Sequence, residues 1–81
     1  MRKNIFVNIW GAQMPATLTT WEEIKKLGFK KSDRSFGSLN DGREALFFNA
    51  GKMFPKADGT LPNNGKDEWF VTTESLNEIN D

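Results

Sequence analysis

Closely spaced turn signals in the second half of the chain limit what it can fold into. Asn-Gly and Asp-Gly pairs favour tight hairpin turns, because both residues tolerate positive φ. Short apolar segments lie between these signals, which predicts a meander of short antiparallel strands. The turn signals are Asn40-Asp41-Gly42, Asn49-Ala50-Gly51, Asp58-Gly59 and Asn63-Asn64-Gly65, and the apolar segments are 36–39, 45–48, 53–54 and 69–73.

Alternating residues near the start of the chain predict a first strand over 4–10. Its two faces both carry bulky side chains, Ile5, Val7 and Ile9 on one and Phe6 and Trp10 on the other, which favours a strand covered on both sides. Gly11-Ala12 then fits a type II′ turn. The segment from Ala12 to Leu18 alternates again, but Pro15 cannot donate to a ladder, so we expect an edge strand or an extended loop there.

The helix signal lies over about residues 20–27. Thr19 or Thr20 can cap the N-terminus, with Glu22 and Glu23 three residues on. The sequence places Lys25 and Lys26 in the last turn, and Gly28 fits the left-handed position after it. The apolar face consists of Trp21, Ile24 and Leu27. So short a helix must bury this face against other elements to be stable.

Together these signals predict an α+β fold, with residues 1–81 as one domain. We expect a three- to five-stranded antiparallel sheet with the short helix packed on one face, and room for a C-terminal helical turn at 75–79. A small β-barrel with a helical insertion is the alternative architecture.

Composition removes several function classes. The chain of 81 residues has 11 Lys+Arg and 11 Asp+Glu, with no His and no Cys. Neither the usual general base nor a thiolate nucleophile is therefore present, and zinc sites lose their main ligands. No apolar run approaches the roughly 18 residues of a membrane span. We expect a cytoplasmic protein that is not an enzyme, does not bind membranes and needs neither metal nor cofactor.

Two motifs that suggest ligand binding fail on inspection. Gly51-Lys52 lacks the surrounding phosphate-loop pattern, because Leu46 and Met53 stand where Gly and Ser or Thr are needed. Reading Asp58 as the first ligand of a calcium loop puts Trp69 where a bidentate Glu is required. Both segments are better explained as turns.

A basic segment over 25–36 supports one functional hypothesis. Single-stranded nucleic acids are bound by cationic side chains around aromatic rings, which stack on bases. The residues that could do this are Lys25, Lys26, Phe29, Lys30, Lys31 and Arg34. The opposing interpretation is a capped helix end followed by a solvated loop, and zero net charge favours it, since dedicated nucleic-acid binders are usually basic.

The aromatic count supports the leading hypothesis. The chain has 7 Phe and 3 Trp, and the neighbours Phe47 and Phe48 must point to opposite faces of a strand, as must Trp69 and Phe70. One short helix cannot cover both faces, so either segments 36–39 and 53–55 wrap the second face or some rings stay exposed for a partner. We expect a protein-binding inhibitor or adaptor, of the kind carried by phages, that engages a larger protein or forms a homodimer. The predicted contact residues are Trp10, Arg43, Phe48 and Phe70.

Overall fold

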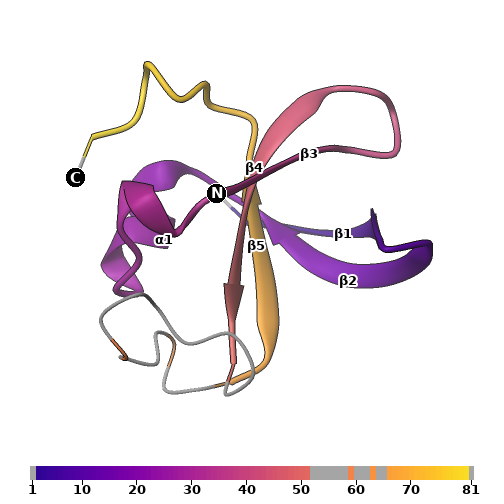
Figure 1. The fold of residues 1–81 in the computed structure, drawn as a ribbon, viewed down its shortest axis with the longest axis horizontal. Coiled ribbons are helices and arrows are strands. Elements are labelled where there is room, and N and C mark those ends of the chain that lie inside the picture. The colour runs from indigo at the N-terminus through magenta and orange to yellow at the C-terminus, as the bar shows by residue number, and fades with distance from the viewer. Residues whose placement is uncertain (1, 52–58, 60–62, 64–65, 81) are drawn as a thin grey trace.

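The computed structural model describes residues 2–51, 59, 63 and 66–80. Figure 1 shows the helices and strands that these described residues form. Their order is β1 (Lys3–Ile9), β2 (Ala12–Leu18), α1 (Trp21–Lys26), η1 (Lys31–Asp33), β3 (Ser35–Ser38), β4 (Glu44–Ala50) and β5 (Glu68–Thr72). The predicted α+β fold is confirmed in part: the described residues form a small fold that is mostly sheet, with a single short α-helix. The segment 53–54, predicted as a strand, lies outside the described residues.

The strands form one mixed sheet in the order β1-β2-β5-β4-β3. Neighbours pair antiparallel except β2 and β5, which are parallel and place Ala16 beside Trp69 and Leu18 beside Val71. The prediction of a purely antiparallel sheet is therefore wrong. β5 lies between β2 and β4 in the sheet. The chain that connects β2 to β5 must therefore cross over, as parallel neighbours require.

Two expectations about the first hairpin need correction. β1 lies at an edge of the sheet and β2 inside it, the reverse of the sequence interpretation. Pro15 is tolerated in β2 because the pairing with β5 is confined to residues 16–18, after the proline. Pro15 pairs only with Phe6 of β1.

The ends of α1 agree with the local signals. Thr20 is the N-cap, and its Oγ1 accepts from the backbone N–H of Glu23 at 3.3 Å. Gly28 follows the helix with a φ of 104°, in the left-handed region that glycine adopts without strain. At the other end of the chain, Glu78 N–H donates to the Ser75 carbonyl oxygen at 2.9 Å and closes a single turn over 76–78, and Ser75 N–H donates to Glu78 Oε1 at 2.9 Å.

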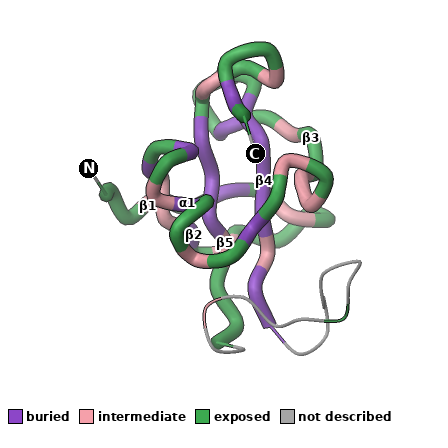
Figure 2. The backbone as a smooth tube through the Cα atoms, turned by 90° about the vertical axis from the view of Figure 1, so that its left-hand side faces the viewer, coloured by how far each residue is buried: buried purple, intermediate pink, exposed green. Residues whose placement is uncertain are grey.

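The sheet has a hydrophobic core on each side. Trp21 and Ile24 of α1 share one buried cluster with residues of β4, β5 and the C-terminal segment. The second cluster is built by the sheet itself and by Leu39 of the β3–β4 hairpin, with Val7, Ala16, Ala45, Phe47 and Val71. Figure 2 shows the resulting buried stretches along β4 and β5 in the middle of the molecule. The central strands are therefore covered on both faces.

The sheet curls and so covers its own face on the side away from α1. The two ends of the sheet approach each other, and Asn40 in the β3–β4 turn donates through Nδ2 to the Phe6 carbonyl oxygen of β1 at 3.1 Å and to Gln13 Oε1 at 2.8 Å. The fold thus lies between the two architectures that the sequence suggests, an open α+β sheet and a small barrel.

Candidate functional site

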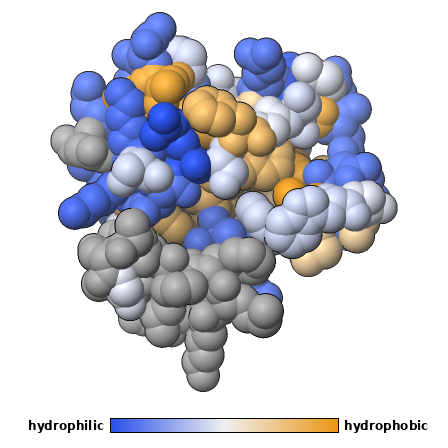
Figure 3. All heavy atoms as spheres, in the orientation of Figure 1, coloured by the Kyte–Doolittle hydropathy of each residue, from blue (hydrophilic) through white to orange (hydrophobic). Residues whose placement is uncertain are grey.

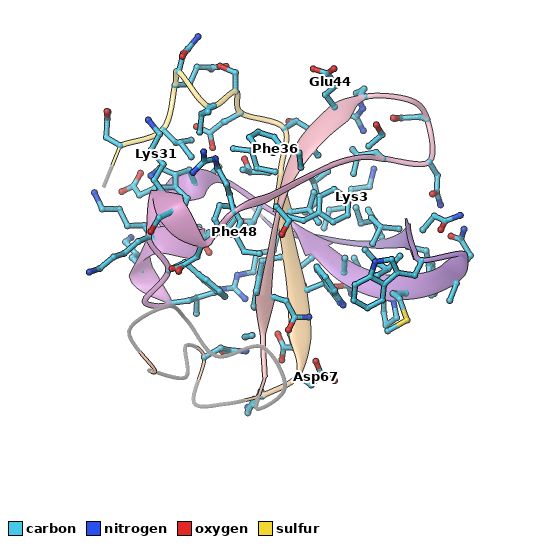
Figure 4. All side chains as sticks on the ribbon, viewed as in Figure 1. Lys3, Lys31, Phe36, Glu44, Phe48 and Asp67 are labelled. Atoms are coloured by element: carbon cyan, nitrogen blue, oxygen red, sulfur yellow. The ribbon has the colours of Figure 1, made fainter. Side chains whose placement is uncertain are left out.

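The four predicted protein-contact residues do not form one surface. Trp10 is 86% exposed at the tip of the first hairpin. Phe48 and Phe70 have no exposed surface, and Figure 4 shows Phe48 on the side of β4 that faces α1. Arg43 is exposed in the β3–β4 hairpin, where its Nε lies 2.8 Å from Asp41 Oδ2. Phe48 and Phe70 are corrected to core residues.

The reason for this correction is geometric. Phe48 and Phe70 point to the side that α1 and the C-terminal segment cover, where Phe29 and Trp21 pack against Phe48 with ring centroids 5.6 and 5.3 Å away. Phe47, on the other face, is buried by the curl of the sheet. Neither face of the two central strands is left open.

Among the described residues, Phe6 and Phe36 stay at the surface together with Trp10. The exposed large apolar side chains of the described residues are Phe6 at 63%, Trp10 at 86% and Phe36 at 70%. Phe6 and Phe36 are not among the contact residues predicted from the sequence. Phe6 points to the face of β1 opposite that of Ile5 and Val7. Because β1 is an edge strand, this alternation is the signal in the sequence that Phe6 is exposed.

Trp10 combines exposure with an unfavourable backbone. Its φ is 51° and that of Gly11 is 86°, while Ile9 pairs with Ala12 across the hairpin. The turn residues are therefore Trp10-Gly11, with positive φ at both, as in a type I′ turn, and not the predicted Gly11-Ala12. Such a turn favours Asn or Gly at its first central position, and a bulky residue there is strained. Neither burial nor local backbone preference explains a tryptophan at this site.

A hollow of about 270 Å³ separates this hairpin from β3. Residues 8–10 line one side and Ser35–Ser38 the other, and the rings of Phe47 and Trp69, with centroids 6.3 Å apart, also line it. Figure 3 shows a notch between the β1–β2 and β3–β4 hairpins, at the right of the molecule. We call these nine lining residues the Trp10–Phe36 surface.

Arg34 borders this surface. Its guanidinium carbon lies 5.3 Å from the centroid of the Phe36 ring, in cation–π geometry. One nitrogen, Nη1, donates to the Lys31 carbonyl oxygen at 3.0 Å. The Nε atom is buried and has no hydrogen-bond partner, and Arg34 forms no salt bridge with the described residues. Among the residues that the structure describes, no carboxylate therefore pairs with the cation at the edge of this surface.

The predicted nucleic-acid residues are also divided. Lys25, Lys26 and Lys30 are exposed, and Lys26 Nζ lies 3.9 Å from Glu22 Oε1. Lys31 and Arg34 are half-buried. Phe29 is only 3% exposed and packs between Phe48 and Phe70, so it cannot stack on a base. This part of the nucleic-acid hypothesis is corrected.

The described residues show no sign of a metal site or a membrane-spanning helix. Within the described residues, no three acidic side chains are grouped so as to hold a metal ion, and no helix has the length and apolar character to cross a membrane. Comparison of the chain with protein-family models, curated proteins and solved structures found no match.

Proposed function

We propose that this protein is a small, non-enzymatic module that binds a larger protein through the Trp10–Phe36 surface. The observation that carries the proposal is Trp10, a large apolar side chain 86% exposed on a backbone with a φ of 51°. Strained residues cost roughly 1–3 kcal/mol and are retained where the surroundings or the function require them. A protein partner that buries the indole would provide such a requirement.

The composition of the surface supports a protein as the partner. Two exposed aromatic side chains, Trp10 and Phe36, border one hollow, with Arg34 beside them. Trp and Arg are the residue types most enriched among those that dominate binding energy in protein interfaces. The absence of His and Cys from the whole sequence leaves few routes to catalysis at neutral pH. Such a protein would act by occupying or recruiting its partner, as an inhibitor or adaptor does.

Quantitative affinity capture from the source cells tests the proposal. The wild-type protein is compared with Trp10→Asn, which removes the indole, and with Lys25→Gln, a matched control at an exposed residue outside the surface. We expect a protein retained by the wild type and the control and lost with Trp10→Asn. Equal retention by all three variants, or retention of no protein, would contradict the proposal.

A salt titration separates the proposal from the nucleic-acid hypothesis. The exposed Lys25, Lys26 and Lys30 could still contact phosphates. If they do so as a site, binding of a labelled single strand should weaken steeply with salt, because each neutralised phosphate releases counterions. We expect no specific binding of the strand. A steep slope that Lys25→Gln and Lys30→Gln reduce would favour nucleic acid as the ligand instead.

A further inference from the structure

The register of β1 shows which of its backbone groups face outward. Ile9 and Ala12 flank a two-residue turn, so they form a hydrogen-bonded pair, and pairs of this kind recur at every second residue. The N–H and C=O groups of Asn4, Phe6 and Asn8 therefore point away from β2. The bond from Asn40 Nδ2 to the Phe6 carbonyl oxygen agrees with this direction.

β3, the edge strand at the opposite end of the sheet, also directs backbone groups outward. Leu39 N–H donates to the Arg43 carbonyl oxygen at 2.8 Å and closes the β3–β4 hairpin. Counting back by two places Gly37 and Ser35 in hydrogen-bonded pairs with β4. The backbone groups of Phe36 and Ser38 consequently face the outer edge of β3.

These two edges border the same hollow. Asn8 contributes from β1, and Phe36 and Ser38 contribute from β3. The hollow thus has outward-pointing backbone donors and acceptors on both sides, and the apolar rings of Phe47 and Trp69 also line it. An extended peptide is the ligand that satisfies backbone groups of a sheet edge while it places alternate side chains in a pocket.

The charge beside the hollow specifies the ligand further. None of the described residues that line the hollow is charged, so the side chain that enters it should be apolar. Arg34 precedes β3, and its guanidinium lies over the Phe36 ring. It forms no salt bridge with the described residues. A planar guanidinium is suited to a carboxylate.

We infer that the Trp10–Phe36 surface binds an extended, acidic segment of the partner protein by strand addition to the outer edge of β3. The segment hydrogen-bonds to Phe36 and Ser38, inserts one apolar side chain between Trp10 and Phe36, and pairs a carboxylate with Arg34. This inference rests on the proposed function and adds the chemistry of the partner to it.

Selection from a random peptide library displayed on phage, with the wild-type protein immobilised, tests the inference. We expect enriched peptides with apolar residues at alternate positions and at least one Asp or Glu. Their affinity, measured with synthetic peptides, should fall about 10- to 100-fold with Arg34→Gln, the range for loss of a charge-assisted bond. Lys25→Gln is the control and should bind as the wild type does. Enrichment of no peptide, of peptides without acidic residues, or equal affinity for Arg34→Gln would overturn the inference.

A peptide with a methylated backbone tests the strand addition separately from the acidic contact. N-methylation of the peptide backbone removes donors that only a paired strand uses, so a methylated copy of the best peptide should bind at least about tenfold more weakly. NMR of the complex should shift the amide resonances of Phe36 and Ser38. A methylated peptide of unchanged affinity, or shifts confined to α1, would contradict the inference.

The two proposals fail in different ways. If affinity capture depends on Trp10 but the selected peptides bind elsewhere or not at all, the partner uses a folded surface and only the strand inference is lost. If capture is independent of Trp10, the proposed function itself fails. Self-association detected by light scattering, and lost with Trp10→Asn, would identify a second copy of this chain as the occupant and would overturn the inference.

Discussion

The backbone N–H of Trp21 donates to Glu74 Oε2 at 2.6 Å and so joins the first turn of α1 to the segment after β5. The same carboxylate oxygen accepts from Thr72 Oγ1 at 3.1 Å, and the Trp21 indole Nε1 donates to the Asn80 carbonyl oxygen at 2.6 Å. These bonds fasten the C-terminal segment over the buried cluster that contains Ile79. A helix N-terminus, with its unpaired N–H groups, is a favourable place for such a carboxylate.

Replacing Glu74 with Ala should therefore destabilise the fold. Hydrogen bonds to a charged group contribute about 1.5–3 kcal/mol, and we expect a loss of that size in the free energy of unfolding by urea. Glu22→Ala, at an exposed position of the same helix, is the control and should cost much less. Equal effects of the two changes would show that the Glu74 bonds contribute nothing specific.

The strained turn at Trp10 predicts a substitution that stabilises the fold. Trp10→Asn places a residue that tolerates positive φ before Gly11, and we expect the free energy of unfolding to rise by about 0.5–1.5 kcal/mol. Trp10→Ala removes the same indole without relieving the strained backbone, so it should not give this gain. Urea denaturation of the three proteins distinguishes them. A less stable Trp10→Asn protein would mean that the indole serves the fold.

A side chain at Gly37 should destabilise the fold. A Cβ built there would lie 3.0 Å from Phe47 Cε1 and 3.2 Å from Cζ, closer than ordinary contacts. The Phe47 ring belongs to the second core and would have to shift, so Gly37→Ala should cost about 1–3 kcal/mol in unfolding free energy. Ser38→Ala, at the exposed neighbour in β3, serves as the control. A stability unchanged by Gly37→Ala would show that the ring moves without cost.

The ion pair of Arg2 with Glu23 predicts a dependence on pH. The Arg2 Nε donates to Glu23 Oε2 at 3.0 Å, and this bond lowers the pKa of Glu23 from its ordinary value of 4.5. A carboxyl whose pKa is lower in the folded state stabilises the fold above the unfolded pKa, and this contribution is lost as the pH falls through the folded pKa.

Glu23→Gln and Arg2→Gln should each remove this contribution. We expect both variants to lose less stability than the wild type as the pH falls below about 5. Salt should reduce this difference, because the pair is exposed. Unfolding followed across that range checks this. Profiles parallel to that of the wild type would show that the pair does not influence folding.

Local signals in the sequence predicted part of the local structure. The turn predicted at Asn49-Ala50-Gly51 is wrong, because Asn49 and Ala50 continue β4 and pair with Trp69 and Glu68 of β5. The Thr20 cap, Gly28 and the turn at Asn40-Asp41-Gly42 depend on residues within a few positions of one another, and the structure confirms them. Hydrogen bonding and backbone preferences act over this range, so they can be recognised without the fold.

Contacts between segments far apart in the sequence could not be predicted from local patterns. The parallel pairing of β2 with β5 joins residues 16–18 to 69–71, and no local pattern specifies it. The two faces of the central strands are covered by segments distant in sequence: Phe48 and Phe70 pack in the cluster with Trp21 and Ile24 of α1, whereas Phe47 packs with Val7 and Leu39 on the other face. The turn at Trp10 was misplaced by one residue because a tryptophan with positive φ runs against local preference.

The most direct measurement of the central claim is ¹⁹F NMR of the protein labelled with 5-fluorotryptophan. The chain has 3 Trp, and the resonance of Trp10 is assigned by its loss in Trp10→Asn. Addition of the protein that affinity capture retains should shift or broaden the Trp10 resonance and leave that of the buried Trp21 in place. A Trp10 resonance that stays unchanged with the partner bound at saturation would contradict the account.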